Sequence, residues 1–367
     1  MKLFCCSSCG HVVFFENVVC ERCNHALGFE PQSREMMALE SADGIWQAVG
    51  SNGGGRWKYC GNYVRGVCNW LIPGDNSDTL CVACRHNLVI PNLRAPRNVA
   101  LWQKMEQAKR RLFYTILQLG LPLTTRSESP EGLGFEFRTT AADRTKPVMT
   151  GHEDGLITIA LAEADDAERE KRRHAMGEPY RTLLGHFRHE VGHWYWDRLV
   201  RDGGVLAECR EVFGNDEEDY GQALQRHYAN GPKPSWQNHY VSSYAGAHAW
   251  EDFAETWAHY FHIVDTLETG GEWGIMLKPE ADRSGLMAVD LDFDIFDGAT
   301  TIEHISRAWT PLAMALNSFN RSLGHQDLYP FVLSPEVIAK LGFIHELVHG
   351  RVGYNRAPVP MQASSAA

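Results

Sequence analysis

The distribution of cysteines is the feature that most restricts how this chain can fold. Nine of the ten cysteines precede residue 85, and the tenth, Cys209, stands alone. Disulfides are rare in reducing compartments, so in such a compartment cysteines clustered in this way indicate bound metal rather than a disulfide framework. We therefore predict that residues 1–95 form a small cysteine-rich module whose short aromatic runs are strands.

The cysteines of this module fall into two sets of four. The first set consists of two C-x-x-C pairs separated by a short strand-like run, as a tetrahedral zinc ribbon requires: Cys6, Cys9, Cys20 and Cys23. The second set ends in a C-x-x-C pair but is spaced more widely in its first half: Cys60, Cys68, Cys81 and Cys84. The alternative is that the second set consists of buried free thiols, but this would not explain why the set ends in a C-x-x-C pair. We expect one structural Zn²⁺ ion in each set.

Charge limits the partners of the chain. Its formal net charge is −11 and its pI is about 5.9, which argues against a protein that neutralises nucleic-acid phosphates or binds anionic membranes. Zinc ribbons often bind nucleic acid or protein, but acidic and basic residues roughly balance in residues 1–95. We therefore expect no nucleic-acid partner and assign the ribbon to docking of a protein partner or substrate.

The start of the chain, from Met1 to Cys6, lacks the apolar core of a signal peptide, and no later run is long enough to span a membrane. These features favour a cytoplasmic location.

Length and composition indicate a globular protein of more than one part. At 367 residues, with 44% hydrophobic and 22% charged residues, the chain is too long for one core of ordinary size. Apolar spacing predicts helices over 97–119 and 249–266, and strands over 134–137 and 156–161. We predict an α+β fold: the β-rich module at 1–95, a mainly helical domain with a small antiparallel sheet at 96–350, and a flexible tail at 351–367.

The strongest indication of chemistry is an H-E-x-x-H motif, His189-Glu190-Val191-Gly192-His193, inside a predicted helix. Positions i and i+4 lie one above the other on a helix, so both imidazoles can bind a single ion. Glu190 lies at the edge of that face, where it can take a proton from a zinc-bound water without acting as a ligand. The motif predicts a catalytic Zn²⁺ bound by His189 and His193, with Glu190 as general base.

The same pattern occurs again at residues 345–349, beginning at His345. After His349 no Asp, Glu, His or Cys remains to supply a third ligand, whereas ample chain follows His193. We therefore interpret the second copy as part of a packing helix capped by Ser334, with its histidines beside an apolar stripe.

A later predicted helix supplies candidates for the third ligand. Glu251, Glu255 and His259 recur along one side of a broad aromatic surface. Carboxylates among so much apolar surface need partners. A zinc ion and its histidines would provide them, with one glutamate as a ligand and the next accepting an imidazole N–H. The alternative is a solvated helical face.

These residues resemble the active site of the gluzincin metallopeptidases. The run E-D-F-A-E at residues 251–255 is similar to that in the catalytic domain of anthrax lethal factor. The resemblance implies a zincin-like domain in which Glu251 is the third zinc ligand and Glu255 accepts a hydrogen bond from a ligand histidine. It also implies that Tyr244 hydrogen-bonds the oxyanion, although a tyrosine in a loop can equally serve packing.

Over most of its length the chain also resembles a bacterial family of zinc-binding metallopeptidases with an N-terminal zinc ribbon. The matching stretches are Gly151 to Ile159, Pro179 to Arg188 and Leu328 to Pro335. This resemblance implies the same class of activity.

We predict a zinc-dependent metallopeptidase that hydrates a peptide carbonyl, with Glu190 passing the proton to the leaving amine. One alternative is a zinc-ribbon adaptor whose peptidase-like domain binds but does not cleave, and the presence of Glu190 argues against it. Another is a metal-dependent hydrolase of other amides.

The predicted strand 156–161 is either a cleft strand that pairs with an extended substrate or an ordinary core strand.

Overall fold

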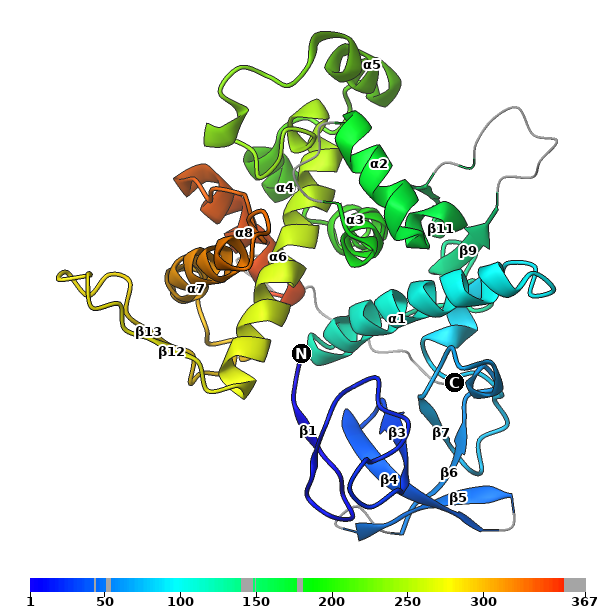
Figure 1. The fold of residues 1–367 in the computed structure, drawn as a ribbon. Coiled ribbons are helices and arrows are strands. Elements are labelled where there is room, and N and C mark those ends of the chain that lie inside the picture. Colours follow the sequence, from blue (N-terminus) through cyan, green and yellow to red (C-terminus); the bar gives the residue numbers. More distant parts are fainter. Residues whose placement is uncertain (43, 51–53, 140–147, 149, 177–180, 353–367) are drawn as a thin grey trace, which may run out of the picture.

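The N-terminal module is built from short antiparallel strands. The computed structural model describes residues 1–42, 44–50, 54–139, 148, 150–176 and 181–352. Strands β1 (Phe4–Cys5) and β2 (Val12–Val13) form a small hairpin. A five-stranded meander follows, in which each strand pairs with the next: β3 (Ala26–Glu30), β4 (Glu35–Ala42), β5 (Ile45–Ala48), β6 (Arg56–Tyr59) and β7 (Leu71–Pro73). The module forms the lower lobe in Figure 1.

The second sheet belongs to the mainly helical part, and its strand order is β10-β11-β9-β8. Its strands are β8 (Asn87–Val89), β9 (Gly134–Arg138), β10 (Gly151–Glu153) and β11 (Leu156–Ala160). Strands β10 and β11 are antiparallel because a two-residue turn joins them, with positive φ at Asp154 and Gly155. The other pairings, β11 with β9 and β9 with β8, are parallel. Helix α1 (Pro96–Gln118) makes the crossover between β8 and β9 that parallel pairing needs.

The α+β class predicted from the sequence is confirmed, and the sheet of the helical part is mixed. Strand β8 lies before residue 95, yet it forms one edge of this sheet. The chain of the N-terminal module therefore continues directly into the second sheet.

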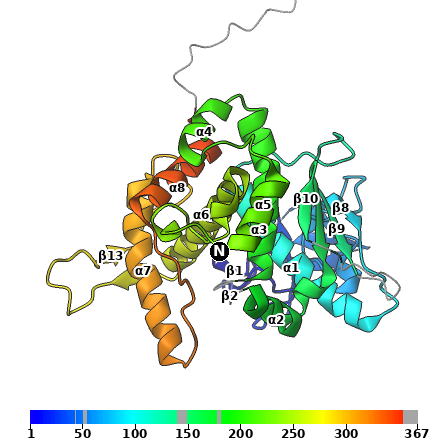
Figure 2. The same ribbon diagram turned by 90° about the horizontal axis from the view of Figure 1, so that it is seen from above.

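Seven helices follow α1 in the described part of the chain, with α3 and α6 at their centre. Their bounds are α2 (Asp166–Met176), α3 (Leu183–Tyr195), α4 (Leu206–Phe213), α5 (Tyr220–Asn230), α6 (Ala249–Glu272), α7 (Ile302–Ser322) and α8 (Pro335–Val348). A π-helical segment, Trp196–Arg201, extends α3. Helices α7 and α8 lie on one side of α6 and the mixed sheet on the other (Figure 2). A hairpin of β12 (Met276–Leu277) and β13 (Val289–Asp290) projects beyond them.

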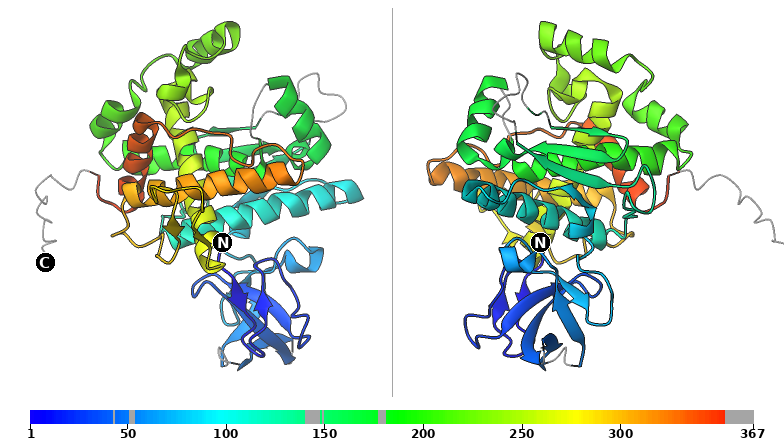
Figure 3. Two further views of the ribbon diagram at one scale, coloured as in Figure 1. Left: turned by 60° about the vertical axis from the view of Figure 1, so that its left-hand side comes forward. Right: turned by 90° about the vertical axis from the view of Figure 1, so that its right-hand side faces the viewer.

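One hydrophobic core runs through both lobes. At their junction the ring of Phe15 lies 4.8 Å from that of Phe29 and 5.6 Å from that of Tyr114 on α1. The N-terminal module thus packs directly beneath α1 (Figure 3). Burial of these aromatic rings ties the two lobes together.

Helices α3 and α6 form the centre of the helical part, and their close approach depends on one glycine. Thr182 caps α3 by accepting a hydrogen bond from the backbone N–H of Gly185 at 3.0 Å. A Cβ at Gly192 would lie 3.2 Å from both the Cα of Ala254 and the ring of Trp257 on α6. The absence of a side chain at Gly192 therefore lets the two helices meet at the level of the H-E-x-x-H motif.

Some sequence features fall outside the described residues. These are Pro179 and Tyr180 of one family-like stretch, and residues 353–367 of the predicted tail. Within the part that is described, no helix combines the length and apolar character needed to cross a bilayer.

Candidate metal centre

The structure brings His189, His193 and Glu251 together at the contact between α3 and α6. The two Nε2 atoms of the histidines lie 3.2 Å apart. Oε2 of Glu251 lies 3.1 Å from Nε2 of His189 and 3.6 Å from Nε2 of His193. Glu251 is almost completely buried, with 1% of its surface exposed, so this carboxylate has lost nearly all contact with water.

The spacing of these atoms fits a zinc ion. Tetrahedral zinc bonds of about 2.0–2.1 Å place neighbouring ligand atoms about 3.3 Å apart. Nδ1 of His189 lies 2.7 Å from the Glu255 carboxylate and therefore carries the proton, which leaves the Nε2 lone pair free. Oε2 of Glu251 is buried and accepts no hydrogen bond. Three acceptor atoms facing one another repel unless a cation lies between them.

Electrostatics at His189 also favour a positive charge. Burial alone would lower the pKa of His189, but the carboxylates of Glu251 and Glu255 raise it well above its usual range. Burial would raise the pKa of Glu255, yet the hydrogen bond with His189 holds it at about 2. The other oxygen of Glu255 accepts the hydroxyl of Ser242 at 2.6 Å. Glu255 is thus ionised and fixed, as an acceptor for a ligand histidine should be.

Glu190 and Tyr244 lie beside this cluster. Glu190 is 9% exposed, and burial raises its pKa, with Glu251 and Glu255 adding to the effect and the two histidines opposing it. The ring of Tyr244 lies 6.1 Å from that of His189. Burial and the nearby Glu251 charge raise the pKa of Tyr244 far above its usual value, so its hydroxyl remains a donor.

Tyr220 is a neighbour of the cluster that the sequence did not point to. Its hydroxyl donates to Oε1 of Glu251 at 2.5 Å. Tyr220 is the first residue of α5, and no motif or regular spacing links it to the ligands. The sequence therefore contained no chemical signal for this residue.

The edge strand nearest the cluster is β10. His152 of β10 has its ring 6.0 Å from that of His193 and 5.9 Å from that of Trp250. Strand β11, which the sequence suggested either as a cleft strand or as a core strand, is paired on both sides and is a core strand. Among the described residues, the edge strand on this side of the sheet, where an extended peptide could pair, is β10 instead.

The second H-E-x-x-H motif lies in α8, which Ser334 caps by accepting from the backbone N–H of Val337. His345 is fully buried, and its Nδ1 lies 2.9 Å from the Tyr260 hydroxyl. Among the described residues no third ligand joins His345 and His349. This helix packs against α6 and α7, as expected of a core element.

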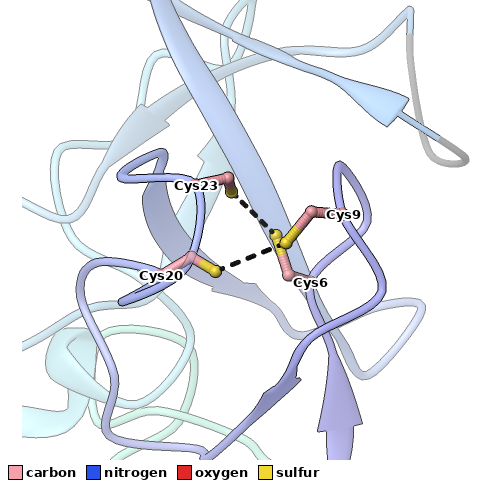
Figure 4. A group of neighbouring side chains, drawn as sticks. All are labelled: Cys6, Cys9, Cys20 and Cys23. Carbon is pink, nitrogen blue, oxygen red and sulfur yellow. Dashed lines mark hydrogen bonds between the residues drawn. The ribbon is translucent and has the colours of Figure 1, made fainter.

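The first set of cysteines forms a compact cluster in the N-terminal module. Figure 4 shows the four side chains pointing toward a common centre. The sulfurs of Cys6 and Cys23 are 3.6 Å apart, and those of Cys9 and Cys20 are 3.7 Å apart. A disulfide requires about 2.05 Å, whereas tetrahedral Zn–S bonds of about 2.3 Å separate the sulfurs by about 3.8 Å. The donor set and spacing fit a zinc ion.

The second set, Cys60, Cys68, Cys81 and Cys84, also converges. All four are buried, and the sulfurs of Cys68 and Cys81 are 3.7 Å apart. Helix α1 contacts this cluster, because Oε2 of Glu106 lies 3.8 Å from the Cys84 sulfur and pairs with Lys109 at 3.0 Å. This cluster therefore lies at the junction of the two lobes.

Comparison with known families agrees with both kinds of site. The model of a family described as "Putative zinc-binding metallo-peptidase" matches residues 98–347. The chain belongs to this metallopeptidase family. A zinc-ribbon domain model matches residues 3–95 ahead of the metallopeptidase match, so zinc binding is supported for both parts.

Two relatives of this chain, from Mycobacterium tuberculosis and Mycobacterium bovis, are each 40% identical over 351 residues. The alignment covers 95% of this chain and 95% of each relative, and both relatives are named as uncharacterized proteins. No solved structure matches the chain.

Proposed function

We propose that this member of the family is a zinc-dependent metallopeptidase that hydrolyses peptide bonds at the cluster of His189, His193 and Glu251. The proposal rests on the convergence of three acceptor atoms, at separations of 3.1–3.6 Å, on one buried point. Glu190, on the turn of α3 that holds both histidines, supplies the base that hydrolysis needs.

Zinc at this cluster would polarise a substrate carbonyl and lower the pKa of a water molecule toward neutrality. Glu190 would accept the proton of that water and deliver it to the leaving amine. Its nearly buried position favours this shuttle because the neutral and ionised forms are closer in energy there than in water. Tyr244, which keeps its hydroxyl proton, would donate to the developing oxyanion.

The peptide substrate would lie along β10, an edge strand of the mixed sheet among the described residues. Backbone hydrogen bonds to an edge strand bind extended peptides with little regard to sequence. Because His152 of β10 lies near His193, a chain paired with this edge would pass beside the cluster.

The test is Glu190→Gln, compared with Glu346→Gln in the second H-E-x-x-H motif as a matched control. We expect Glu190→Gln to lower kcat by about 10²–10⁴-fold on a peptide library, because the base is lost, while its metal content stays unchanged. Glu346→Gln should cleave like the wild type. Wild-type cleavage by Glu190→Gln would contradict the assigned base.

Metal analysis of the same proteins separates a peptidase from an adaptor. We expect about three zinc ions per wild-type chain, one in each cysteine cluster and one at the histidine cluster. If the wild type binds all three ions but cleaves neither peptides nor isopeptides, the result would favour the adaptor function instead.

A further inference from the structure

We propose that Tyr220 is a positioning residue that holds Glu251 so that only one oxygen of its carboxylate faces the metal. The inference rests on the proposed function of the histidine cluster and adds a residue 31 positions earlier in the chain.

The two oxygens of Glu251 have different partners. Oε1 accepts the Tyr220 hydroxyl at 2.5 Å. Oε2 faces the imidazoles, at 3.1 Å from His189 and 3.6 Å from His193. A short O–H···O⁻ hydrogen bond is among the stronger ones in proteins, so it fixes the rotation of the carboxylate.

Tyr220 is itself well anchored over the start of α6. Asp219 caps α5 by accepting from the backbone N–H of Gln222 at 2.7 Å. The Tyr220 ring contacts the rings of His248 and Trp250, with centroids 5.4 Å and 5.7 Å away. Both residues precede Glu251 at the start of α6, so the phenol ring lies on the turn that presents the ligand.

A second hydrogen bond ties the same segment to α6. His248 accepts from the backbone N–H of Trp250 and places its Nε2 3.0 Å from the backbone oxygen of Glu218. Glu218 and Tyr220, the residues before and after Asp219, therefore both contact the start of α6. The Trp250 ring in turn lies 3.9 Å from that of His193. The start of α5 thus contacts Glu251 directly, and it reaches His193 through Trp250 and His189 through Glu251.

A carboxylate held in this way acts as a ligand through one oxygen. Two histidines and one carboxylate oxygen leave a fourth tetrahedral position for water, which catalytic zinc sites require. Without the Tyr220 hydroxyl, Glu251 could rotate and offer both oxygens. That rotation would weaken the fixed geometry and compete with water for the open position.

The experiment compares Tyr220→Phe with Tyr228→Phe, which removes a hydroxyl from the same helix at a residue that is 69% exposed. Zinc affinity is measured by competition with a chelator, and His189→Ala gives the metal bound by the cysteine clusters alone. Visible absorption of Co²⁺ bound at the site reports the coordination of the ligand set. Tyr220 is 38% exposed and phenylalanine keeps its ring contacts, so thermal unfolding should show both variants folded.

We expect Tyr220→Phe to weaken zinc binding at this site about 10- to 100-fold and to weaken the Co²⁺ absorption bands as the coordination number rises. Tyr228→Phe should match the wild type in both. Tyr244→Phe should lower kcat while keeping wild-type zinc affinity, which separates the two tyrosines.

Unchanged zinc affinity and Co²⁺ absorption in Tyr220→Phe would overturn the inference and leave the peptidase proposal intact. A wild type that binds the additional zinc but cleaves no peptide would overturn the peptidase proposal, while weaker binding by Tyr220→Phe would still support the inference. A wild type that binds no more metal than His189→Ala would overturn both.

Discussion

The two H-E-x-x-H motifs place the same residue types in opposite electrostatic surroundings. His189 faces two carboxylates, and its pKa lies well above the usual range because their charges and the hydrogen bond to Glu255 outweigh burial. His345 is fully buried without a carboxylate partner, and burial together with His349 and Arg351 lowers its pKa to about 4. A cation is therefore favoured at the first motif and disfavoured at the second.

The buried neutral state of His345 makes a prediction for the pH dependence of stability. Histidine in the unfolded chain takes up a proton near pH 6.5, whereas His345 in the folded protein resists it until about pH 4. The contribution of neutral His345 to the free energy of unfolding is therefore complete above pH 6.5 and is lost as the pH falls from 6.5 to 4. The stability advantage of the wild type over His345→Asn, which keeps an acceptor for Tyr260, should shrink by up to about 3 kcal/mol.

The measurement is urea unfolding of both proteins at pH 7 and pH 4.5. The exposed His325→Asn provides the control for replacing a histidine with asparagine at the surface. A constant difference for His345→Asn as well would contradict the buried neutral state.

At the scale of elements, the site depends on how closely α3 approaches α6. The H-E-x-x-H motif supplies its two histidines from one face of α3, but the carboxylate comes from α6. Gly192 permits the contact, since a Cβ there would lie 3.2 Å from the Cα of Ala254 and from the ring of Trp257. Trp257 is fully buried, so neither neighbour has room to withdraw.

We expect Gly192→Ala to destabilise the protein by about 1–3 kcal/mol through overpacking. The cost of overpacking exceeds the stabilisation of about 1 kcal/mol that alanine gives a helix relative to glycine. The displaced α3 should also bind zinc more weakly at the histidine cluster. Denaturant unfolding and chelator competition measure the two effects.

Gly221→Ala in α5 is the matched control, because its Cβ would have only an ordinary contact of 3.5 Å with Asp219. It should be neutral or slightly stabilising. Equal stability of the two variants would show that the helices can separate without cost.

At the scale of the whole molecule, the second cysteine cluster joins the N-terminal module to the helical part. It lies against Glu106 and Lys109 of α1, both of them fully buried, and the chain continues from it directly into β8. A hydrophobic core shared by both lobes surrounds this junction. Loss of the ion should therefore loosen the contact between lobes and not only the ribbon itself.

We expect Cys81→Ser to remove one zinc ion per chain and to destabilise the junction by several kcal/mol, because buried thiolate ligands lose their cation. Cys5→Ser should change neither, since Cys5 is exposed and lies outside both clusters. Metal analysis and limited proteolysis of the N-terminal module are the measurements. Full zinc content with wild-type protease resistance in Cys81→Ser would contradict the assignment.

Local spacing was enough to predict the candidate ligands. A C-x-x-C pair and an H-E-x-x-H helix place their side chains within one turn, so backbone geometry alone brings His189 and His193 to one face. The helical repeat on α6 gave Glu251, Glu255 and His259 as candidates, and the resemblance to the gluzincins singled out Glu251 as the ligand and Glu255 as its neighbour. The α+β class followed from the same kind of local pattern.

Relations between distant segments were decided only by the tertiary structure. Which strand is the free edge, how α1 meets Cys84 and how Tyr220 reaches Glu251 all depend on how whole elements pack. The two H-E-x-x-H motifs are alike in sequence, and only their neighbours make one attract a cation and the other exclude it. Packing brings together groups far apart in the chain, and their charges and burial then set the chemistry.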